Sequence, residues 1–330
     1  MEEINPISTG FFTSGSNIWN NDYGSLPYEG YSVMEMASMR VLTPPWRGCM
    51  VSMAMDCLDC QYLQEVIEEG DPTYVAMILS EIKDYLHQLM KHQFGNYLIQ
   101  KIFEAKKGIT NIQIDSIIYL IIYDTHKLTD VCKNNHGTRV MQIMLENMKC
   151  PVTKYAVLYM MKPIIDELMK NINGGYVIVQ CVKVFPPTLK KVILDELAKY
   201  CVEIATHKIG GSVLQTCLKD SEILAMGLIT SIISNAMLLV EDCYGNVVED
   251  LMKCSNQDDV NAIVEELIRS TDFLNVIQEP YGNYVAQRAL KCTKGYLRRK
   301  LSFTIRSYRI ELQNHPHGKI VLDNAKSSKR

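Results

Sequence analysis

The sequence of 330 residues has little net charge, only two Trp and no long uninterrupted apolar run. Asp124, Lys162 and Glu241 interrupt its longest apolar stretches before these reach the roughly 18 residues that a membrane-spanning helix needs. The acidic N-terminus also lacks the basic region and apolar core of a secretory signal. We therefore expect a soluble protein without a membrane-spanning segment.

The short cysteine spacings of small disulfide-bonded domains are also missing, since the 11 Cys are scattered through long segments. The C-x-x-C pair of Cys57 and Cys60 has no second pair or nearby His to complete a zinc site. We expect reduced thiols in a reducing compartment, and neither a metal nor another cofactor.

The two ends of the chain differ from its middle. Residues 1–48 carry Gly, Ser, Asn, Pro and Tyr without sustained periodicity, and Pro44-Pro45 excludes helix there. We expect this segment, with a net charge of −3, to be a flexible, disordered tail. The last 40 residues contain 11 Lys or Arg against two acids, which favours an anionic partner.

From residue 49 onward, apolar residues recur at three- and four-residue spacing between short polar connections, which predicts an all-α body. A phrase ending in Gly introduces a similar helix about every 36 residues. The seven glycines are Gly95, Gly137, Gly174, Gly210, Gly245, Gly282 and Gly318, and Asp59 takes the equivalent place in a first unit. Eight such units fill residues 49–330, so we expect a single repeat domain.

Counted from that Gly, the third, fourth, seventh and eighth residues form one apolar helical face, which Glu249 and Lys253 interrupt in the sixth unit. Positions one, two and five are predicted to point away from this buried face. Position five is an amide in five of eight units, and position two is Tyr or Arg in four. A merely solvated face would vary freely, so this surface is predicted to bind something flat and hydrogen-bonding.

Amides present a donor beside an acceptor, and aromatic rings or guanidinium groups stack on flat faces, which is the chemistry that splayed single-stranded bases require. Stacking contributes about 1–3 kcal/mol per base. The alternative is structural: the tyrosines would cap packing between helices, and the glutamines would bond across neighbouring turns. The candidate RNA-binding residues are Cys60, Gln61, Gln64, Asn96, Tyr97, Gln100, Thr138, Arg139, Gln142, Tyr176, Gln215, Asn246, Asn283, Tyr284 and Gln287.

No catalytic constellation stands out, and we expect no enzyme. Most histidines lie just before a repeat Gly, which is typical of helix ends and connections rather than of catalysis. They are His92, His136, His207, His315 and His317.

The phrases Phe94-Gly95-Asn96-Tyr97-Leu98-Ile99-Gln100 and Tyr281-Gly282-Asn283-Tyr284-Val285-Ala286-Gln287 resemble the helix motif of the Pumilio family of RNA-binding proteins. The resemblance covers residues 49–330 and repeats at the period of the family. It implies an all-α, right-handed α-solenoid, a crescent of about eight three-helix Pumilio repeats. The concave face would bind single-stranded RNA, one base per repeat, in 3′ untranslated regions of messenger RNA, to repress translation or promote decay.

In that family, Asn at position one with Gln at position five reads uracil, and Cys, Ser or Thr with Gln reads adenine. Carried over, the resemblance implies uracil at Asn96 with Gln100 and at Asn283 with Gln287. Adenine is implied in the first and third units. The sequence departs from the family pattern at Gly175, Val179, Gly211 and Asp250, and it has no Ser-to-Glu pairing for guanine, so the usual UGU core is not implied. The eighth unit, with Lys319, Ile320 and Asp323, resembles a terminal capping repeat.

Two other interpretations stay open. A peptide-binding scaffold of the armadillo or HEAT kind would have periods nearer 40–47 and no reason to repeat Gln at position five. A nuclear or nucleolar ribosome-biogenesis protein of low sequence specificity would bind RNA broadly, with a steep salt dependence. We expect a cytoplasmic monomer that has repressor or deadenylation proteins as partners on its convex face.

Overall fold

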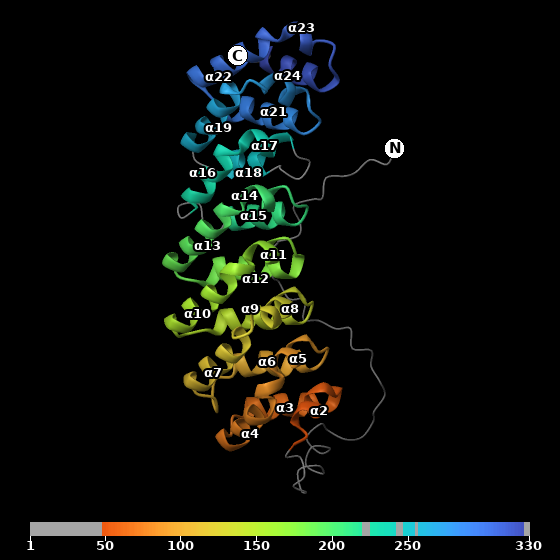
Figure 1. Cartoon of the computed structure of the whole chain (residues 1–330), viewed down its shortest axis with the longest axis vertical. Coiled ribbons are helices and arrows are strands. Elements are labelled where there is room, and N and C mark those ends of the chain that lie inside the picture. The colour runs from red at the N-terminus through yellow and green to blue at the C-terminus, as the bar shows by residue number, and fades with distance from the viewer. Residues whose placement is uncertain (1–47, 220–224, 242–246, 255–256, 327–330) are drawn as a thin grey trace. The chain divides into compact units, whose positions relative to one another are not determined.

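The computed structural model describes residues 48–219, 225–241, 247–254 and 257–326. Every regular element within these ranges is a helix, as the sequence predicts (Figure 1). The expected tail lies outside the described residues apart from Gly48, as do the repeat glycine Gly245 and the candidate Asn246. None of the described helices is long and apolar enough to cross a lipid bilayer.

The helices group into eight units: the first has two described α-helices, each later unit has three, and a short 3-10 helix is added in the second and fourth units. The first unit comprises α2 (Met50–Met55) and α3 (Cys57–Glu69). The next three units are α4 (Pro72–Ile82), η2 (Lys83–Tyr85), α5 (Leu86–Lys91) and α6 (Gly95–Glu104); α7 (Asn111–Ile122), α8 (Thr125–Lys133) and α9 (Gly137–Asn147); and α10 (Pro151–Met161), η3 (Lys162–Ile164), α11 (Ile165–Met169) and α12 (Ile172–Val184).

The remaining four units repeat the same order. They are α13 (Pro187–Lys199), α14 (Cys201–Ala205) and α15 (Gly210–Lys219); α16 (Met226–Ser234), α17 (Ala236–Glu241) and α18 (Val247–Cys254); α19 (Gln257–Arg269), α20 (Phe273–Gln278) and α21 (Gly282–Cys292); and α22 (Gly295–Ser307), α23 (Arg309–Leu312) and α24 (Pro316–Lys326).

Equivalent helices of successive units pack side by side. The last helices of the units, α3, α6, α9, α12, α15, α18, α21 and α24, each contact the next and form what we call the third-helix row. The helices α7, α10, α13, α16, α19 and α22 do the same and form the first-helix row. Figure 1 shows both rows running along residues 48–326 as parallel columns of helices. The predicted α-solenoid is thus confirmed.

The core lies between the rows and follows the predicted helical face. In α9 this face is completely buried, with Val140, Met141, Met144 and Leu145 at 0% exposure. Glu249 interrupts the face in α18, as expected, and it remains half-buried because it is paired. Its carboxylate oxygen lies 3.1 Å from Arg288 Nη2 of the next unit and 3.1 Å from Lys253 Nζ of its own helix.

The repeat position requires Gly because the second and third helices of a unit meet there without space for a side chain. A Cβ added at Gly137 would overlap the carbonyl oxygen of Val131, which lies six residues earlier at the end of α8. The residue six positions earlier blocks each described repeat glycine, namely Leu89, Val131, Leu168, Ile204, Val276 and Leu312. The glycines therefore mark the sharp corner between the second and third helices. In the first unit α3 begins at Cys57, so Asp59 lies within its first turn and faces no such corner.

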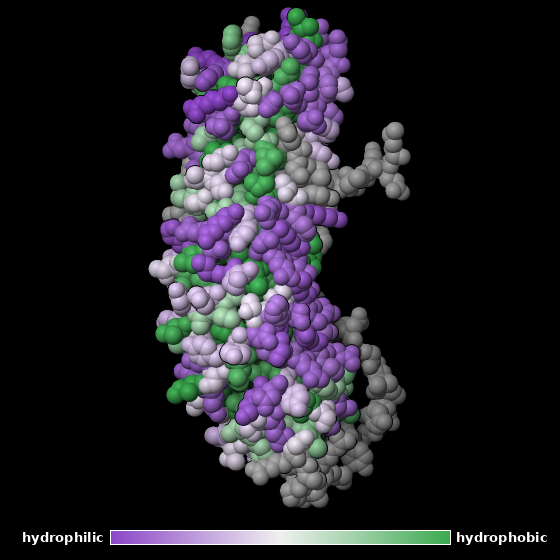
Figure 2. Space-filling view, viewed as in Figure 1, coloured by the Kyte–Doolittle hydropathy of each residue, from purple (hydrophilic) through white to green (hydrophobic). Residues whose placement is uncertain are grey.

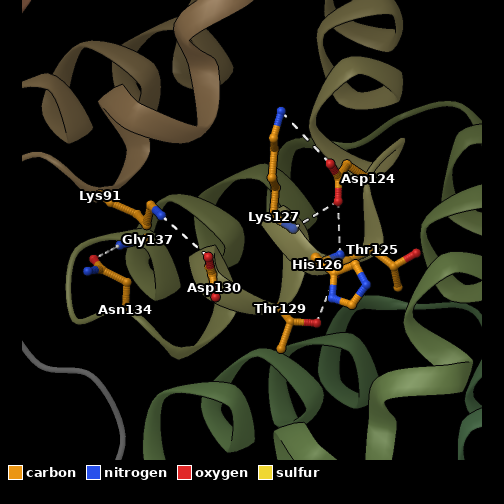
Figure 3. A network of polar contacts seen from close by, with 9 residues as sticks. All are labelled: Lys91, Asp124, Thr125, His126, Lys127, Thr129, Asp130, Asn134 and Gly137. Atoms are coloured by element: carbon orange, nitrogen blue, oxygen red, sulfur yellow. Dashed lines mark hydrogen bonds and ion pairs between the residues drawn. The ribbon is translucent and has the colours of Figure 1, made fainter.

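Polar side chains complete each corner, as Figure 3 shows for the third unit. The carboxylate of Asp124 caps α8 by accepting hydrogen bonds from the backbone N–H groups of its first turn. Beyond the other end of α8, the Asn134 side-chain oxygen accepts a hydrogen bond of 3.0 Å from the N–H of Gly137. An ion pair of 3.7 Å between Lys91 and Asp130 links this unit to the preceding one.

Three histidines take the place of Asn134 in other units. The Nδ1 atoms of His92, His207 and His315 accept the N–H of the repeat glycine three residues later, at 3.3, 3.3 and 3.2 Å. Their interpretation as connection residues is therefore confirmed. His136 precedes α9 directly and makes no side-chain capping bond.

A Gly137→Ala substitution tests the corner. We expect it to lower the free energy of unfolding by about 1–3 kcal/mol, because the methyl group forces the two helices apart. The measurement is urea unfolding followed by helical circular dichroism.

Gly227→Ala is the matched control, since Gly227 is exposed in α16 and an added Cβ there would meet only the Asp195 side chain. It should be neutral or stabilise the helix by up to about 1 kcal/mol. Equal destabilisation by the two substitutions would contradict the packing explanation.

Candidate nucleic-acid interface

The described candidate residues all lie on the third-helix row, at the same register in each helix. They come from α3, α6, α9, α12, α15 and α21, and neighbouring helices of this row pack against one another. The fold therefore brings candidates that are about 36 residues apart in sequence into one continuous series. Asn246 would belong to the same series but lies outside the described residues.

Position one does not point away from the core, and at position five Gln100 is also buried with 4% exposure, so those parts of the prediction are wrong. Cys60, Asn96, Thr138 and Asn283 have exposures of only 1%, 2%, 4% and 1%. Their polar atoms are turned toward backbone carbonyl groups at the corner. Thr138 Oγ1 donates to the carbonyl of Asn173 at 2.8 Å, and Cys60 Sγ donates to that of Phe94 at 3.3 Å. Both carbonyls belong to the residue before the next unit's glycine, which confirms the register assigned to the first unit.

In the first, second, third and seventh units, the side chain at position five bonds back to the one at position one. Nε2 of Gln100 donates to Oδ1 of Asn96 at 2.8 Å, and Nε2 of Gln287 donates to Oδ1 of Asn283 at 2.9 Å. The two other pairs are weaker: Gln142 Nε2 lies 3.3 Å from Thr138 Oγ1, and Gln64 Nε2 lies 3.5 Å from Cys60 Sγ.

Burial raises the pKa of the Cys60 thiol to about 11, and the hydrogen bond from Gln64 only partly offsets this. The side chain is therefore a neutral S–H donor in the neutral pH range. A neutral donor at position one matches the hydroxyl of Thr138, which occupies the same register in the third unit. The first and third units thus present the same kind of polar pair.

The Asn96–Gln100 pair in α6 shows what remains available to a ligand. Both N–H groups of Asn96 are used, since Nδ2 donates to the carbonyls of His92 at 2.8 Å and Gln93 at 3.0 Å. Gln100 donates one N–H to Asn96, and this bond leaves its other N–H and its carbonyl oxygen unused. The pair thus offers one donor next to one acceptor, held in a fixed orientation by the corner.

The Asn283–Gln287 pair of α21 is built in the same way, but its acceptor has a further partner. Nδ2 of Asn324, on α24 of the next unit, donates to Oε1 of Gln287 at 3.1 Å. Nothing in the sequence pattern signals Asn324, because no other unit has Asn at the corresponding place.

Position two carries the accessible flat side chains, as predicted. Tyr284 is 59% exposed, Arg139 is exposed, and Tyr97 and Tyr176 are half-buried. Each directly follows the position-one residue on its helix. The sixth unit differs, because Val247 at this position is completely buried.

The fourth unit cannot form an amide pair, for two structural reasons. A Cβ added at Gly175 would come within 2.6 Å of a methyl group of Val213, so the close approach of α12 and α15 excludes a side chain there. Val179, which replaces the Gln of position five, is buried with 3% exposure. In the fifth unit Gln215 is half-buried opposite Gly211, which has no side chain. The Asp250 side chain lies outside the described residues.

No metal site accompanies the row. In the described parts of the chain, no three His, Cys, Asp or Glu side chains come close enough to hold an ion. The chemistry available is therefore that of amides, hydroxyl groups, one thiol, aromatic rings and a guanidinium group.

Comparison with known proteins identifies the repeat. The family model described as the Pumilio-family RNA binding repeat matches residues 50–83, 85–105, 127–153, 165–198, 200–222, 246–268 and 272–301. Pumilio homolog 12 of Arabidopsis thaliana is 32% identical over 322 residues, which cover 86% of this chain and 53% of that protein. Pumilio homolog 9 of the same plant is 31% identical, over 83% of this chain and 54% of its own length. The chain thus spans about half the length of these relatives.

Solved structures agree with the fold. The RNA-binding domain of yeast Puf5p, solved with AAT2 RNA, has a TM-score of 0.73 at 20% identity, covering 86% of this chain and 85% of that one. The Puf4 RNA-binding domain, solved with the 3′ UTR recognition sequence of HO endonuclease RNA, has a TM-score of 0.57 at 25% identity, with 83% and 97% covered.

The repeat glycines, the register of the amide pairs and the match of the family model over most of residues 50–301 lead to one conclusion: this chain belongs to the Pumilio family of RNA-binding repeat proteins.

Proposed function

We propose that this chain binds single-stranded RNA in a sequence-dependent manner, with one base read by each complete unit of the third-helix row. The observation that carries the proposal is the recurring amide pair, which presents a donor and an acceptor beside an accessible flat side chain. A base that stacks on the flat side chain would place its Watson–Crick edge against the amide of position five. The relatives solved with RNA support this reading.

The order of bases follows from the family resemblance. If the RNA runs antiparallel to the protein, as the family resemblance implies, units three, two and one read A, U and A toward the 3′ end. The seventh unit reads U toward the 5′ end. The fourth unit discriminates weakly, because Gly175 and Val179 leave no polar side chain at positions one and five. We expect weak discrimination in units five and six as well.

We propose further that the target is the 3′ untranslated region of messenger RNA and that binding in the cytoplasm controls translation and stability. Such control requires a protein partner, and the first-helix row offers a surface for one. Four exposed tyrosines lie there: Tyr119 on α7, Tyr123 directly after α7, and Tyr155 and Tyr159 on the neighbouring α10. Tyrosine is enriched in protein interfaces because its ring is amphipathic and rigid.

Replacing Tyr97 by Ala tests the stacking role. We expect RNA affinity to fall by about 1–3 kcal/mol, because the base of the second unit loses its stacking surface. The unfolding midpoint should change little, since the ring is only half-buried. Fluorescence anisotropy with a selected RNA measures the effect.

Tyr123→Ala is the control, because Tyr123 is 85% exposed on the first-helix row. It should leave RNA affinity unchanged. If both variants lost affinity equally, or neither lost any, the third-helix row would not be the stacking surface.

A change of base preference tests the one-base-per-unit reading. The combined substitution Asn96→Ser and Gln100→Glu should shift the preferred base at that position from U toward G. The reason is that a carboxylate accepts both N–H groups of the guanine edge but cannot donate to uracil. Selection from a random RNA pool, before and after the change, gives the preference. An unchanged base preference at this position, or equal shifts at the neighbouring positions, would contradict the proposal that each unit reads one base.

The salt dependence separates this proposal from broad, low-specificity RNA binding. For an eight-nucleotide RNA we expect log affinity to fall with log salt at a slope on the order of −2 to −4, since base edges and stacking supply most of the affinity. A much steeper slope together with no sequence preference would favour the ribosome-biogenesis alternative. Titration at several salt concentrations provides the measurement.

A further inference from the structure

The last unit carries a second surface that does not belong to the third-helix row. Helix α22 buries Leu297, Leu301 and Ile305 against the core. Its opposite side carries a run of residues spaced three or four apart, so that they share one helical face. We call this run the α22 stripe; it consists of Tyr296, Arg299, Lys300, Phe303 and Arg306.

All five stripe residues are exposed, and the two aromatic rings are exposed to an unusual degree. Tyr296 is 73% and Phe303 is 70% exposed. Large rings left this accessible on a soluble surface mark a binding site when they are grouped. Figure 2 shows that the end of the molecule formed by α22 and α23 is largely hydrophilic, with hydrophobic side chains between.

The cations of the stripe have no acidic partners. Among the described residues, none of Arg299, Lys300 and Arg306 forms an ion pair. The neighbouring helix α19 differs, because its Arg269 pairs with Glu265 at 2.9 Å and with Glu266 at 3.9 Å. The positive charge of α22 is therefore left for an anionic partner, whereas that of α19 is neutralised within the helix.

Residues around the stripe extend the same charge. Lys291 and Lys294 precede it, and Arg309 follows it on α23, all of them exposed. The nearest acid in sequence is Glu311, also exposed. Aromatic rings that alternate with cations are the arrangement that stacks bases while neutralising phosphates, whereas an acidic peptide would gain nothing from the rings beyond their apolar area.

We propose that the α22 stripe binds the single-stranded RNA that continues beyond the bases read by the third-helix row. The cations contact phosphates, and Tyr296 and Phe303 stack bases without selecting among them. The site lies in the eighth unit, where the antiparallel reading places the 5′ side of the RNA. This inference rests on the proposed function, because the proposed direction of the RNA decides where the stripe lies relative to the bases that are read.

The test compares three RNAs: a selected eight-nucleotide core, the core with a ten-uridine extension at its 5′ end, and the core with the same extension at its 3′ end. Wild-type protein should bind the 5′-extended RNA about tenfold more tightly than the core, and the salt slope should steepen by about 2 for three phosphate contacts. The 3′ extension should add little.

Two variants locate the effect. Arg299→Gln with Lys300→Gln and Arg306→Gln should abolish the gain from the 5′ extension and leave core binding unchanged. Tyr296→Ala with Phe303→Ala should remove part of the gain without changing the salt slope. The matched control replaces three other exposed cations without ion pairs in the described structure, Lys83→Gln, Lys106→Gln and Lys149→Gln, and should keep the full gain.

Equal affinities of wild type for the core and the 5′-extended RNA would overturn the inference and leave an acidic protein as the occupant. A charge variant that weakened core and extended RNA alike, or a control that lost the gain, would overturn it as well. Failure to bind any core RNA would contradict the proposed function instead. Free ten-uridine RNA then tests the stripe by itself, since the charge variant and the aromatic variant should both lose affinity for it and the control variant should not.

Discussion

The close contact between the second and third helices of each unit is the constraint on which the rest of the structure depends. Near the start of the third helix, each described repeat glycine lies against the residue six positions earlier, which leaves no space for a side chain. A side-chain oxygen or an imidazole nitrogen then accepts the N–H of that Gly and completes the corner. Because the corner repeats, each third helix starts at the same angle, and its polar residues come into register with those of neighbouring units.

That corner also fixes the orientation of the candidate reading residues. Asn96 and Asn283 are held by backbone carbonyls that precede their helices, and they in turn hold Gln100 and Gln287. The structural and functional interpretations of these amides are therefore compatible, because the bond to Asn96 uses only one N–H of Gln100. Pre-organisation of this kind lowers the entropic cost of binding.

Charge is distributed in a way that suits such a protein. Ion pairs join neighbouring units in the middle of the array, for example Lys133 with Glu167 at 2.7 Å and Lys170 with Glu203 at 3.5 Å. These pairs neutralise the body, so specificity can rest on bases rather than on phosphates. The unpaired cations of the α22 stripe stand at the end of the array, where they can add affinity without competing with the units that read bases.

The sequence by itself determined the helical class, the number of units and the register, because a period of about 36 residues repeats the same local geometry in each unit. It also placed the exposed or half-buried flat side chains of position two. Only the tertiary structure decided that Asn96 and Thr138 are buried, that Gly175 makes way for Val213, and that Asn324 reaches Gln287. Helical periodicity assigns a side chain to a face of its own helix. Burial and hydrogen bonding at these positions depend instead on how closely the neighbouring unit packs, which no local sequence pattern predicts.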